Sequence, residues 1–395
     1  MFRRRAWAVA AAVVVGLSAL NVSATASAHQ TEGAPATIAA ADPPGPHGRA
    51  EALVAEMTTA EQAASIVMGH IPTTDTTALS AYMAQGLGGF ILMGANIPAT
   101  DAELLALTAS LTVDAEIPPL IAIDQEGGIV SRLPGDTYAA STTLKSRPVA
   151  DTSAAFSARA ALVAKMGIGV DFGTVADVTA DPASFIYGRA LGTDPTSSAD
   201  RVEAATIAQE QVVASTLKHF PGHGAAPGDS HHAIPTTDET LEEWRASDAV
   251  PFVAGIDVGA SLLMFGHLAY TAVDSAPASL SARWHEIARE ELGFDGVIVT
   301  DDLGMLQSSG LPEYSDPVVN AVTAVVAGSD LVLMIAGSTA DTASEIVAGI
   351  TAAVDAGTLP AERLADAATR VMSLRLQSTA SSAQWSLCAE CEPAG

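Results

Sequence analysis

Short apolar runs alternate with longer amphipathic stretches along most of the chain. Eight of these runs are typical of buried parallel strands, at residues 64–70, 88–93, 120–124, 169–172, 213–219, 261–267, 296–301 and 330–335. The amphipathic stretches between them predict helices, among them 101–113, 152–166, 198–212, 240–253, 282–292 and 341–356. Strands that alternate with helices in this way predict an α/β fold, a (β/α)8 TIM barrel that forms a single catalytic domain.

An open, doubly wound sheet would produce the same alternation. However, no glycine-rich phosphate-binding sequence follows the first predicted strand. Polar residues instead follow several different strands: Asp124 ends the third run, Lys218 and His219 the fifth, His267 the sixth and Asp301 the seventh. Barrel enzymes assemble their sites at the carboxyl ends of many strands, so this distribution favours the barrel.

The first 28 residues differ from this pattern. Three arginines precede an apolar run from Ala6 to about Leu20, and the small residues Ala26, Ser27 and Ala28 follow as a possible cleavage site. This order predicts a secretory signal peptide, with an uncleaved membrane anchor as the alternative. We expect the protein to be secreted or associated with the cell envelope, with no stable membrane insertion once the signal is removed.

The remaining chain divides into three parts. Residues 29–48 are rich in small residues and proline and predict a flexible linker, 49–377 form the expected barrel domain, and 378–395 form a polar tail. No second sandwich domain is expected. Cys388 and Cys391 lie in the tail, and in an exported protein this spacing is typical of a local disulfide.

The net charge of the chain excludes one class of binding partner, the nucleic acids. The chain has 18 Lys and Arg against 45 Asp and Glu, a net charge of −27, and the predicted signal contains three of the basic residues and no acidic one. Nucleic-acid binding needs clustered basic residues, so DNA and RNA are excluded as partners.

The rarest polar residue types gather in one glycine- and proline-rich segment. Four of the nine histidines lie between positions 219 and 232, directly after Lys218, one of three lysines. Loops of this kind commonly carry function. Within the segment, Asp229 can fix the tautomer of the His231 ring, which makes the ring a proton donor and then an acceptor. His223, which has glycine on both sides, is the histidine most readily given a structural role.

Acidic residues at two other strand ends offer further chemistry. Adjacent residues on a strand point in opposite directions, so only one of Asp301 and Asp302 can face the barrel axis and attack an electrophilic carbon; the other is structural. Asp124 and Arg132 could bind a polyhydroxyl ligand, or they could serve only as a helix start and a surface ion pair.

Three segments together resemble glycoside hydrolase family 3, in its β-N-acetylglucosaminidase branch: KHFPGHG followed by DSH, IDQEGG with a downstream arginine, and GFDGVIVTDDLGM. The resemblance covers roughly residues 50–376. It implies a (β/α)8 barrel that hydrolyses terminal β-linked N-acetylglucosamine with retention, through a covalent glycosyl-enzyme. The implied substrates are carbohydrates such as peptidoglycan fragments or chitooligosaccharides, and the implied process is peptidoglycan turnover.

The resemblance also implies roles for individual residues. Asp301 would be the nucleophile, and His231 with its partner Asp229 would be the acid/base. The sugar-binding positions would be Asp124, Arg132, Arg189, Lys218 and His219. Two positions depart from the family pattern: Ala190 stands where serine is usual, and Ile129 stands where many relatives have arginine. His267 also resembles a family position.

Several other functions fit the same residues. A β-glycoside phosphorylase or a broader β-glucosidase of the same family would use the same site. A metal-dependent barrel hydrolase would use His219, His223, His231 and His232 with Asp301 as ligands. A sugar-binding protein without catalysis would need no nucleophile and proton donor together. We expect the hydrolase, acting as a monomer without a metal or another cofactor.

Overall fold

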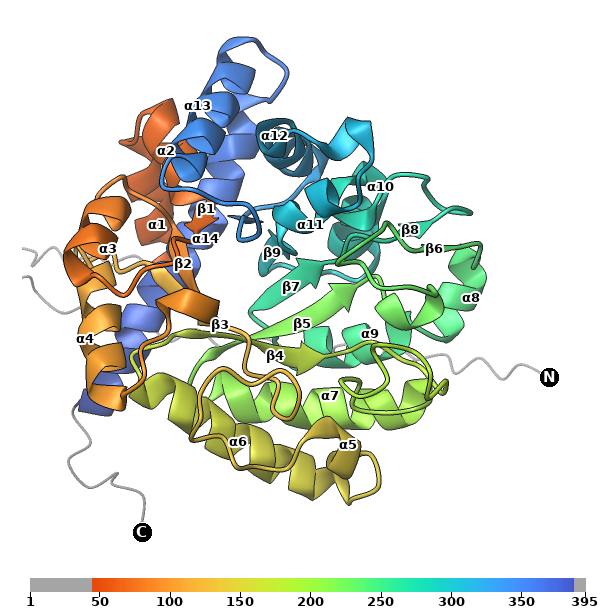
Figure 1. The fold of residues 1–395 in the computed structure, drawn as a ribbon. Helices are drawn as coiled ribbons and strands as arrows, with labels where there is room; N and C mark the ends of the chain where they lie inside the picture. Colours follow the sequence, from red (N-terminus) through yellow and green to blue (C-terminus); the bar gives the residue numbers. More distant parts are fainter. Residues whose placement is uncertain (1–44, 387–395) are drawn as a thin grey trace, which may run out of the picture. The chain divides into compact units, whose positions relative to one another are not determined.

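Eight parallel strands form one sheet in the computed structural model, which describes residues 45–386. Their order is β10-β1-β2-β3-β4-β5-β7-β9, and a parallel bridge between Val299 and Leu331 joins the last strand to the first (Figure 1). The strands are β1 (Val67–Gly69), β2 (Gly89–Leu92), β3 (Leu120–Ile123), β4 (Val170–Val175), β5 (Ala214–Phe220), β7 (Leu262–Phe265), β9 (Val297–Thr300) and β10 (Val332–Leu333). Each predicted apolar run overlaps one of them, so the expected barrel is confirmed.

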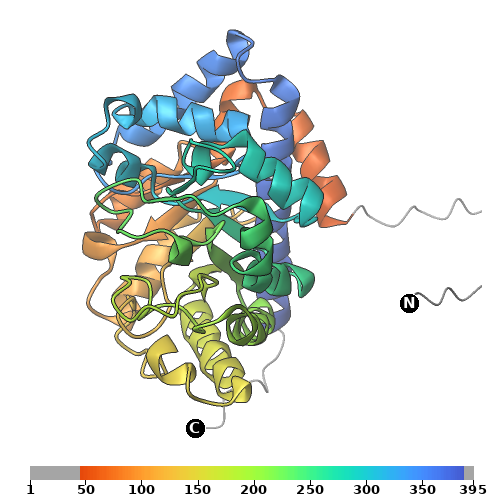
Figure 2. The same cartoon turned by 90° about the vertical axis from the view of Figure 1, so that its right-hand side faces the viewer.

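Helices surround this sheet, as Figures 1 and 2 show. They are α1 (Pro46–Ala55), α2 (Thr59–Ser65), α3 (Thr76–Met83), α4 (Asp101–Leu111), α5 (Ser141–Leu144), α6 (Val149–Lys165), α7 (Pro195–Glu210), α8 (Leu241–Ala246), α9 (Ala249–Asp257), α10 (Ala282–Glu286), α11 (Leu303–Ser308), α12 (Pro317–Ala327), α13 (Thr342–Asp355) and α14 (Ala361–Ser386). Among the described residues, no helix is both long and apolar enough to cross a membrane.

Two predicted helices differ in form from the expectation. The stretch 240–253 forms two helices, α8 and α9, because Pro251 has no N–H to donate and its ring would clash with the preceding turn of a continuous helix. The stretch 282–292 begins as α10 and continues as a π-helical turn over Ile287–Glu291. Elsewhere helix starts follow the local sequence, as at α4, where Thr100 and Glu103 form a capping box.

A cluster of aromatic side chains supports the end of β5. The Phe220 ring lies 4.7 to 5.9 Å from four other aromatic rings, measured between centroids: Trp244, Phe252, Phe265 and Trp284. All five side chains are buried. This packing fixes the strand directly after Lys218 and His219, the two candidate site residues that β5 carries.

A second, short pair of parallel strands lies beyond the barrel sheet. β6 (Thr236–Thr237) pairs with β8 (Ala269–Tyr270), and the Ala269 N–H also donates to the Pro235 carbonyl at 2.9 Å. The pair therefore holds the far end of the segment that follows β5.

The ends of the barrel domain differ slightly from the expected boundaries. α1 begins at Pro46, inside the expected linker, and α14 continues through residue 378 into the expected polar tail. The predicted signal peptide, most of the linker and the Cys388/Cys391 pair lie outside the described residues.

Candidate active site

The candidate residues lie at one end of the barrel. Asp124 directly follows β3, Lys218 and His219 lie near the end of β5, and Asp301 directly follows β9. The carboxyl ends of parallel strands meet at one face, so residues far apart in the sequence come together there.

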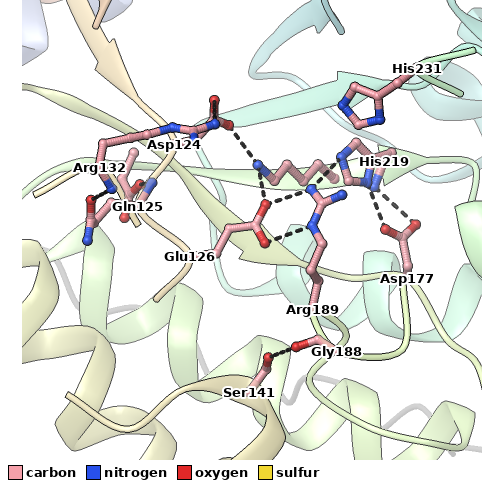
Figure 3. A network of polar contacts seen from close by, with 12 residues as sticks. Asp124, Gln125, Glu126, Arg132, Ser141, Asp177, Gly188, Arg189, His219 and His231 are labelled. Carbon is pink, nitrogen blue, oxygen red and sulfur yellow. Dashed lines mark hydrogen bonds and ion pairs between the residues drawn. The ribbon is translucent and has the colours of Figure 1, made fainter. Parts of the chain in front are cut away.

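Glu126 connects two of the predicted sugar-binding residues (Figure 3). Its Oε1 lies 2.7 Å from Lys218 Nζ and 2.7 Å from Arg189 Nη2, and Arg189 Nε donates to its Oε2 at 2.9 Å. Lys218 Nζ also donates to Asp124 Oδ1 at 2.8 Å. Burial acts to raise the pKa of Glu126, but Lys218 and Arg189 outweigh it and lower the pKa to about 2. The carboxylate is therefore ionised at neutral pH.

Arg132 lies at the edge of this network. Its Nη2 is 3.8 Å from Asp124 Oδ2, and its side chain is 32% exposed. The loop that carries it is held by the buried Gln125, whose Oε1 accepts the Arg132 N–H at 2.8 Å and whose Nε2 donates to Asp136 at 2.7 Å. Asp136 in turn forms a fully buried ion pair with Arg159 at 2.7 Å. The loop that carries Arg132 is thus held in place by buried polar contacts.

Asp177 orients His219 from the end of β4. Its Oδ2 accepts from the His219 ring Nδ1 at 2.8 Å, and its Oδ1 accepts the backbone N–H groups of His219 and His223 at 3.1 and 2.6 Å. His219 Nε2 lies 3.2 Å from Arg189 Nη2, which assigns the proton of the ring to Nδ1. Burial acts to raise the pKa of Asp177, but the attraction of His219 and these hydrogen bonds lower it.

Asp301 and Asp302 divide into two different roles. Burial acts to raise the pKa of Asp301, but attraction to His219 and His267 outweighs it, so the pKa is lowered and the carboxylate stays ionised. Asp302 caps α11 by accepting the Gly304 N–H at 2.9 Å, and it also accepts the N–H groups of two residues after β10. Burial nevertheless raises its pKa to about 6. Asp302 therefore serves the fold, and Asp301 is the carboxylate available for chemistry.

Asp229 and His231 form a hydrogen-bonded pair on the segment after β5, which we call the histidine loop (residues 221–235). The ring Nδ1 of His231 lies 2.5 Å from Asp229 Oδ1, and the side chains are 55% and 39% exposed. Figure 3 shows His231 above His219. Within the described residues, no hydrogen bond or ion pair connects this pair to the buried network. The pair leaves Nε2 of His231 free to exchange a proton with a ligand.

Two other histidines of the site region, His223 and His267, are buried, whereas His232 is exposed. The His223 ring lies 4.6 Å from the Phe185 ring, and burial lowers its pKa to about 4. His267 is held by Ser279 Oγ at 2.7 Å and by the Asp302 carbonyl at 2.8 Å. In the part of the chain that the structure describes, no three His, Cys, Asp or Glu side chains converge as metal ligands would.

Comparisons with known proteins decide the family. A profile of the glycosyl hydrolase family 3 N-terminal domain matches residues 58–374. The chain belongs to glycosyl hydrolase family 3. The match spans the described barrel except α1 and the end of α14, so every site residue named above lies within the family domain.

Curated relatives and solved structures in family 3 give the same result. A β-hexosaminidase of Chromobacterium violaceum is 36% identical over 266 residues, 63% of this chain and 71% of that protein. One of Pseudomonas aeruginosa is 37% identical over 256 residues, 63% of this chain and 75% of that protein. The expected family and its β-N-acetylhexosaminidase branch are confirmed.

Two solved structures extend the similarity to most of the family 3 barrel. A β-N-acetylglucosaminidase from Paenibacillus matches with a TM-score of 0.75 at 30% identity, over 82% of this chain and 63% of that one. This chain therefore spans less than two thirds of that protein's length. A β-N-acetylhexosaminidase from Beutenbergia cavernae matches with a TM-score of 0.71 at 28% identity, over 81% of this chain and 99% of the other.

The two departures from the family 3 pattern occupy different environments. Ala190 is fully buried, and Arg189 before it still reaches Glu126. Ile129 is 73% exposed at the tip of the turn after Glu126.

Sequence reasoning missed two residues of the network, Glu126 and Asp177. Glu126 lies two positions after Asp124, a spacing that can place both on one side of an extended segment, and this signal was present in the IDQEGG sequence. Asp177 was harder to find because the apolar run that predicted β4 ends at Phe172, whereas the strand itself continues to Val175.

Proposed function

We propose that this family 3 glycoside hydrolase is an exported, retaining exo-β-N-acetylglucosaminidase. It cleaves terminal β-linked N-acetylglucosamine from peptidoglycan fragments or chitooligosaccharides. The observation that carries the proposal is that two groups suited to catalysis lie in different environments. A partly buried, ionised carboxylate, Asp301, lies close to His219 and Lys218, and a separate Asp229/His231 pair lies on an exposed loop.

The first step forms a glycosyl-enzyme. An Asp301 oxygen attacks the anomeric carbon and forms a C–O bond, while the bond to the leaving oxygen breaks and His231 Nε2 transfers a proton to that oxygen. In the second step His231 accepts a proton from water, and the water oxygen displaces Asp301 from the anomeric carbon. Two displacements at one carbon retain the β configuration.

The buried network would hold the sugar during both steps. Asp124 accepts hydrogen bonds, whereas Lys218 and Arg132 donate them, so together they suit a ring that carries several hydroxyl groups. Because the ions are already paired with one another, the network keeps its geometry before the sugar binds. Such preorganisation favours recognition of one terminal sugar.

The nucleophile is tested with an isosteric variant, Asp301→Asn. Turnover of an aryl β-N-acetylglucosaminide should fall by about 10³-fold or more, since the amide retains the shape but cannot attack the carbon. Circular dichroism of both proteins checks that the fold is intact. Wild-type turnover by the variant contradicts the assignment.

The acid/base is tested through the leaving group. His231→Ala should slow substrates with a poor, alkyl-like leaving group far more than aryl substrates, because a good leaving group needs little protonation. Equal losses for both substrates would assign His231 a role other than proton transfer.

One observation also favours a phosphorylase. The proposed acid/base, His231, is a histidine, and a histidine does not repel an incoming phosphate as a carboxylate would. In phosphate buffer a phosphorylase releases a sugar 1-phosphate, whereas a hydrolase releases the free sugar, and mass spectrometry separates the two. Aryl glucosides in the same assay measure tolerance for substrates without the acetamide.

Export is supported by the arginines, apolar run and small-residue site of residues 1–28. Expression of the full chain in its native cells, followed by fractionation and N-terminal sequencing, tests it. The expected product begins at or near His29 outside the cytoplasm, and an intact Met1 in the cytoplasm contradicts export.

A further inference from the structure

His267 is a buried histidine that has no role in the mechanism proposed above. It lies two residues after β7, and Asp301 directly follows the neighbouring strand β9. The residue is 0% exposed. Buried polar side chains are nearly always hydrogen-bonded, so the partners of this ring show what it holds in place.

Both ring nitrogens of His267 have a partner. Nε2 lies 2.8 Å from the backbone carbonyl oxygen of Asp302, and Nδ1 lies 2.7 Å from Ser279 Oγ. Because a carbonyl oxygen only accepts, Nε2 carries the proton and Nδ1 accepts from the Ser279 hydroxyl. Burial lowers the pKa of His267, so the ring is neutral near pH 7. One donor and one acceptor, both used, fix the orientation of the ring.

Ser279 is itself held in place by the backbone on either side of His267. It is fully buried in a single 3-10 turn, Ala278–Leu280. The Ser279 N–H donates to the Gly266 carbonyl at 3.2 Å, and the Ala278 N–H donates to the Leu268 carbonyl at 2.8 Å. The hydroxyl group that orients the His267 ring is therefore fixed relative to the backbone of His267.

The backbone of Asp302 connects His267 to the carboxylate of Asp301. The Asp302 carbonyl accepts from His267, and the Asp302 N–H donates to Asp301 Oδ1 at 2.8 Å. The Asp301 N–H donates to the Phe265 carbonyl at 2.9 Å, which ties the backbone of Asp301 to β7. Within residues 45–386, no hydrogen bond reaches Asp301 Oδ2. One oxygen of the carboxylate is held, and the other is available for attack.

We propose that His267 and Ser279 are positioning residues for the nucleophile, which they orient through the backbone of Asp302 so that Asp301 attacks with Oδ2. The inference rests on the proposed function, because it concerns the nucleophile of that same reaction. Oδ2 forms the bond to the anomeric carbon while the bond to the leaving oxygen breaks, and the leaving oxygen takes its proton from His231. Oδ1 becomes the carbonyl oxygen of the ester and still accepts from the Asp302 N–H.

Two substitutions of His267 differ in the hydrogen-bond donor alone. The side chain of His267→Gln keeps an N–H donor, whereas that of His267→Met has a similar length and no donor. For an aryl β-N-acetylglucosaminide, kcat/KM should fall about 10- to 100-fold in the methionine variant, because the carboxylate loses its fixed orientation. It should stay within about fivefold of wild type in the glutamine variant. Inhibition by free N-acetylglucosamine should change less than about twofold in both, since His267 makes no hydrogen bond to the sugar-binding residues.

The pH profile of kcat/KM reports on the nucleophile directly, because Asp301 must be ionised to attack. Burial acts to raise the pKa of Asp301, whereas attraction to His219 and His267 and the hydrogen bond from the Asp302 N–H lower it. A weaker Asp302 hydrogen bond raises this pKa, so the acid limb of the methionine variant should move up by about half a pH unit or more. The other titratable groups that face Asp301 are unchanged in these variants: His219, Lys218, His223 and Asp302.

A matched pair of serine variants separates positioning from packing. His285 is also buried between a carbonyl and a serine, with Nδ1 2.8 Å from the Ser281 carbonyl oxygen and Nε2 2.9 Å from Ser329 Oγ. Ser279→Ala and Ser329→Ala each remove one buried hydroxyl from a buried histidine, but Ser329 precedes β10, at the opposite end of the strands from Asp301. Both should lose similar stability in urea unfolding. Only Ser279→Ala should lower kcat/KM, by about fivefold, and move the acid limb upward.

Several results would overturn the proposal. Equal losses in the two His267 variants with an unmoved acid limb would do so, as would a Ser279→Ala variant that behaves like Ser329→Ala. If the His267 variants do not fold, the serine pair decides alone. In a trapped glycosyl-enzyme, an ester through the oxygen that the Asp302 N–H bonds would contradict attack by Oδ2. A wild type without activity on the aryl substrate means that the proposed function fails, whereas an active wild type with these results means that only the positioning inference fails.

Discussion

Removal of the charge of Glu126 should destabilise the protein strongly without changing its shape. The side chain is 3% exposed and bonds to Lys218 and Arg189 at 2.7 to 2.9 Å, so Glu126→Gln leaves two buried cations with one fewer carboxylate. Breaking a buried pair typically costs about 3 to 5 kcal/mol. The pKa gives a similar figure, since about 2 in the folded state against an ordinary 4.5 corresponds to about 3 kcal/mol at neutral pH.

The lowered pKa of Glu126 also predicts how the stability difference between wild type and Glu126→Gln changes with pH. The folded pKa of Glu126 is lowered, so its contribution to stability is complete well above pH 4.5 and is lost as the pH falls toward 2. The stability difference between wild type and Glu126→Gln should therefore shrink from about 3 kcal/mol at pH 7 to roughly 2 kcal/mol at pH 3.5.

Urea unfolding of both proteins, followed by circular dichroism, measures this difference at each pH. KM for an aryl β-N-acetylglucosaminide should also rise in the variant, because Lys218 and Arg189 lose their common anchor. A stability difference below about 1 kcal/mol, or one that does not change with pH, would refute the account of Glu126 as an ionised hub.

Three further substitutions probe the frame around the site. Asp302→Ala removes the cap of α11 and two further hydrogen bonds, and should cost about 2 to 4 kcal/mol in urea unfolding; a loss within error would contradict its structural role. Asp136→Asn leaves the buried Arg159 without a carboxylate and should cost about 3 to 5 kcal/mol by the same measurement. Gly224→Ala would place a Cβ 1.7 Å from the Val178 carbonyl, so the histidine loop must shift, and kcat should fall about 10- to 100-fold; unchanged kcat would show that the loop position is unimportant.

The sequence predicted the barrel well because its signal is local. Each buried strand needs a short apolar run on its own, and the eight runs are separated by amphipathic helices whose pattern depends only on neighbouring residues. The break between α8 and α9 was missed although Pro251 was visible, because the amphipathic pattern continues through it. The apolar periodicity of a sequence carries no information about the N–H that a proline lacks, so it does not predict this break.

The site was harder to predict because its contacts join distant segments. Asp124, Lys218 and Asp301 could be selected as polar residues at strand ends, a property of each segment alone. The role of Glu126 depends on Lys218 and Arg189, which are 92 and 63 residues away, and no pattern near Glu126 records them. Burial and pKa follow from such pairings, so they could be assigned only once the fold was known.

The histidine loop is fastened at both ends by contacts that do not involve its tip. At one end Asp177 accepts the His223 N–H, and at the other Pro235 accepts the Ala269 N–H beside the β6–β8 pair. Residues 224–234 thus form a segment that is held at both ends by contacts to the barrel domain. The residues of the segment itself take no part in those two contacts. Transplanting this segment between relatives should transfer the Asp229/His231 pair, the proposed proton donor, which makes the loop a natural target for enzyme engineering.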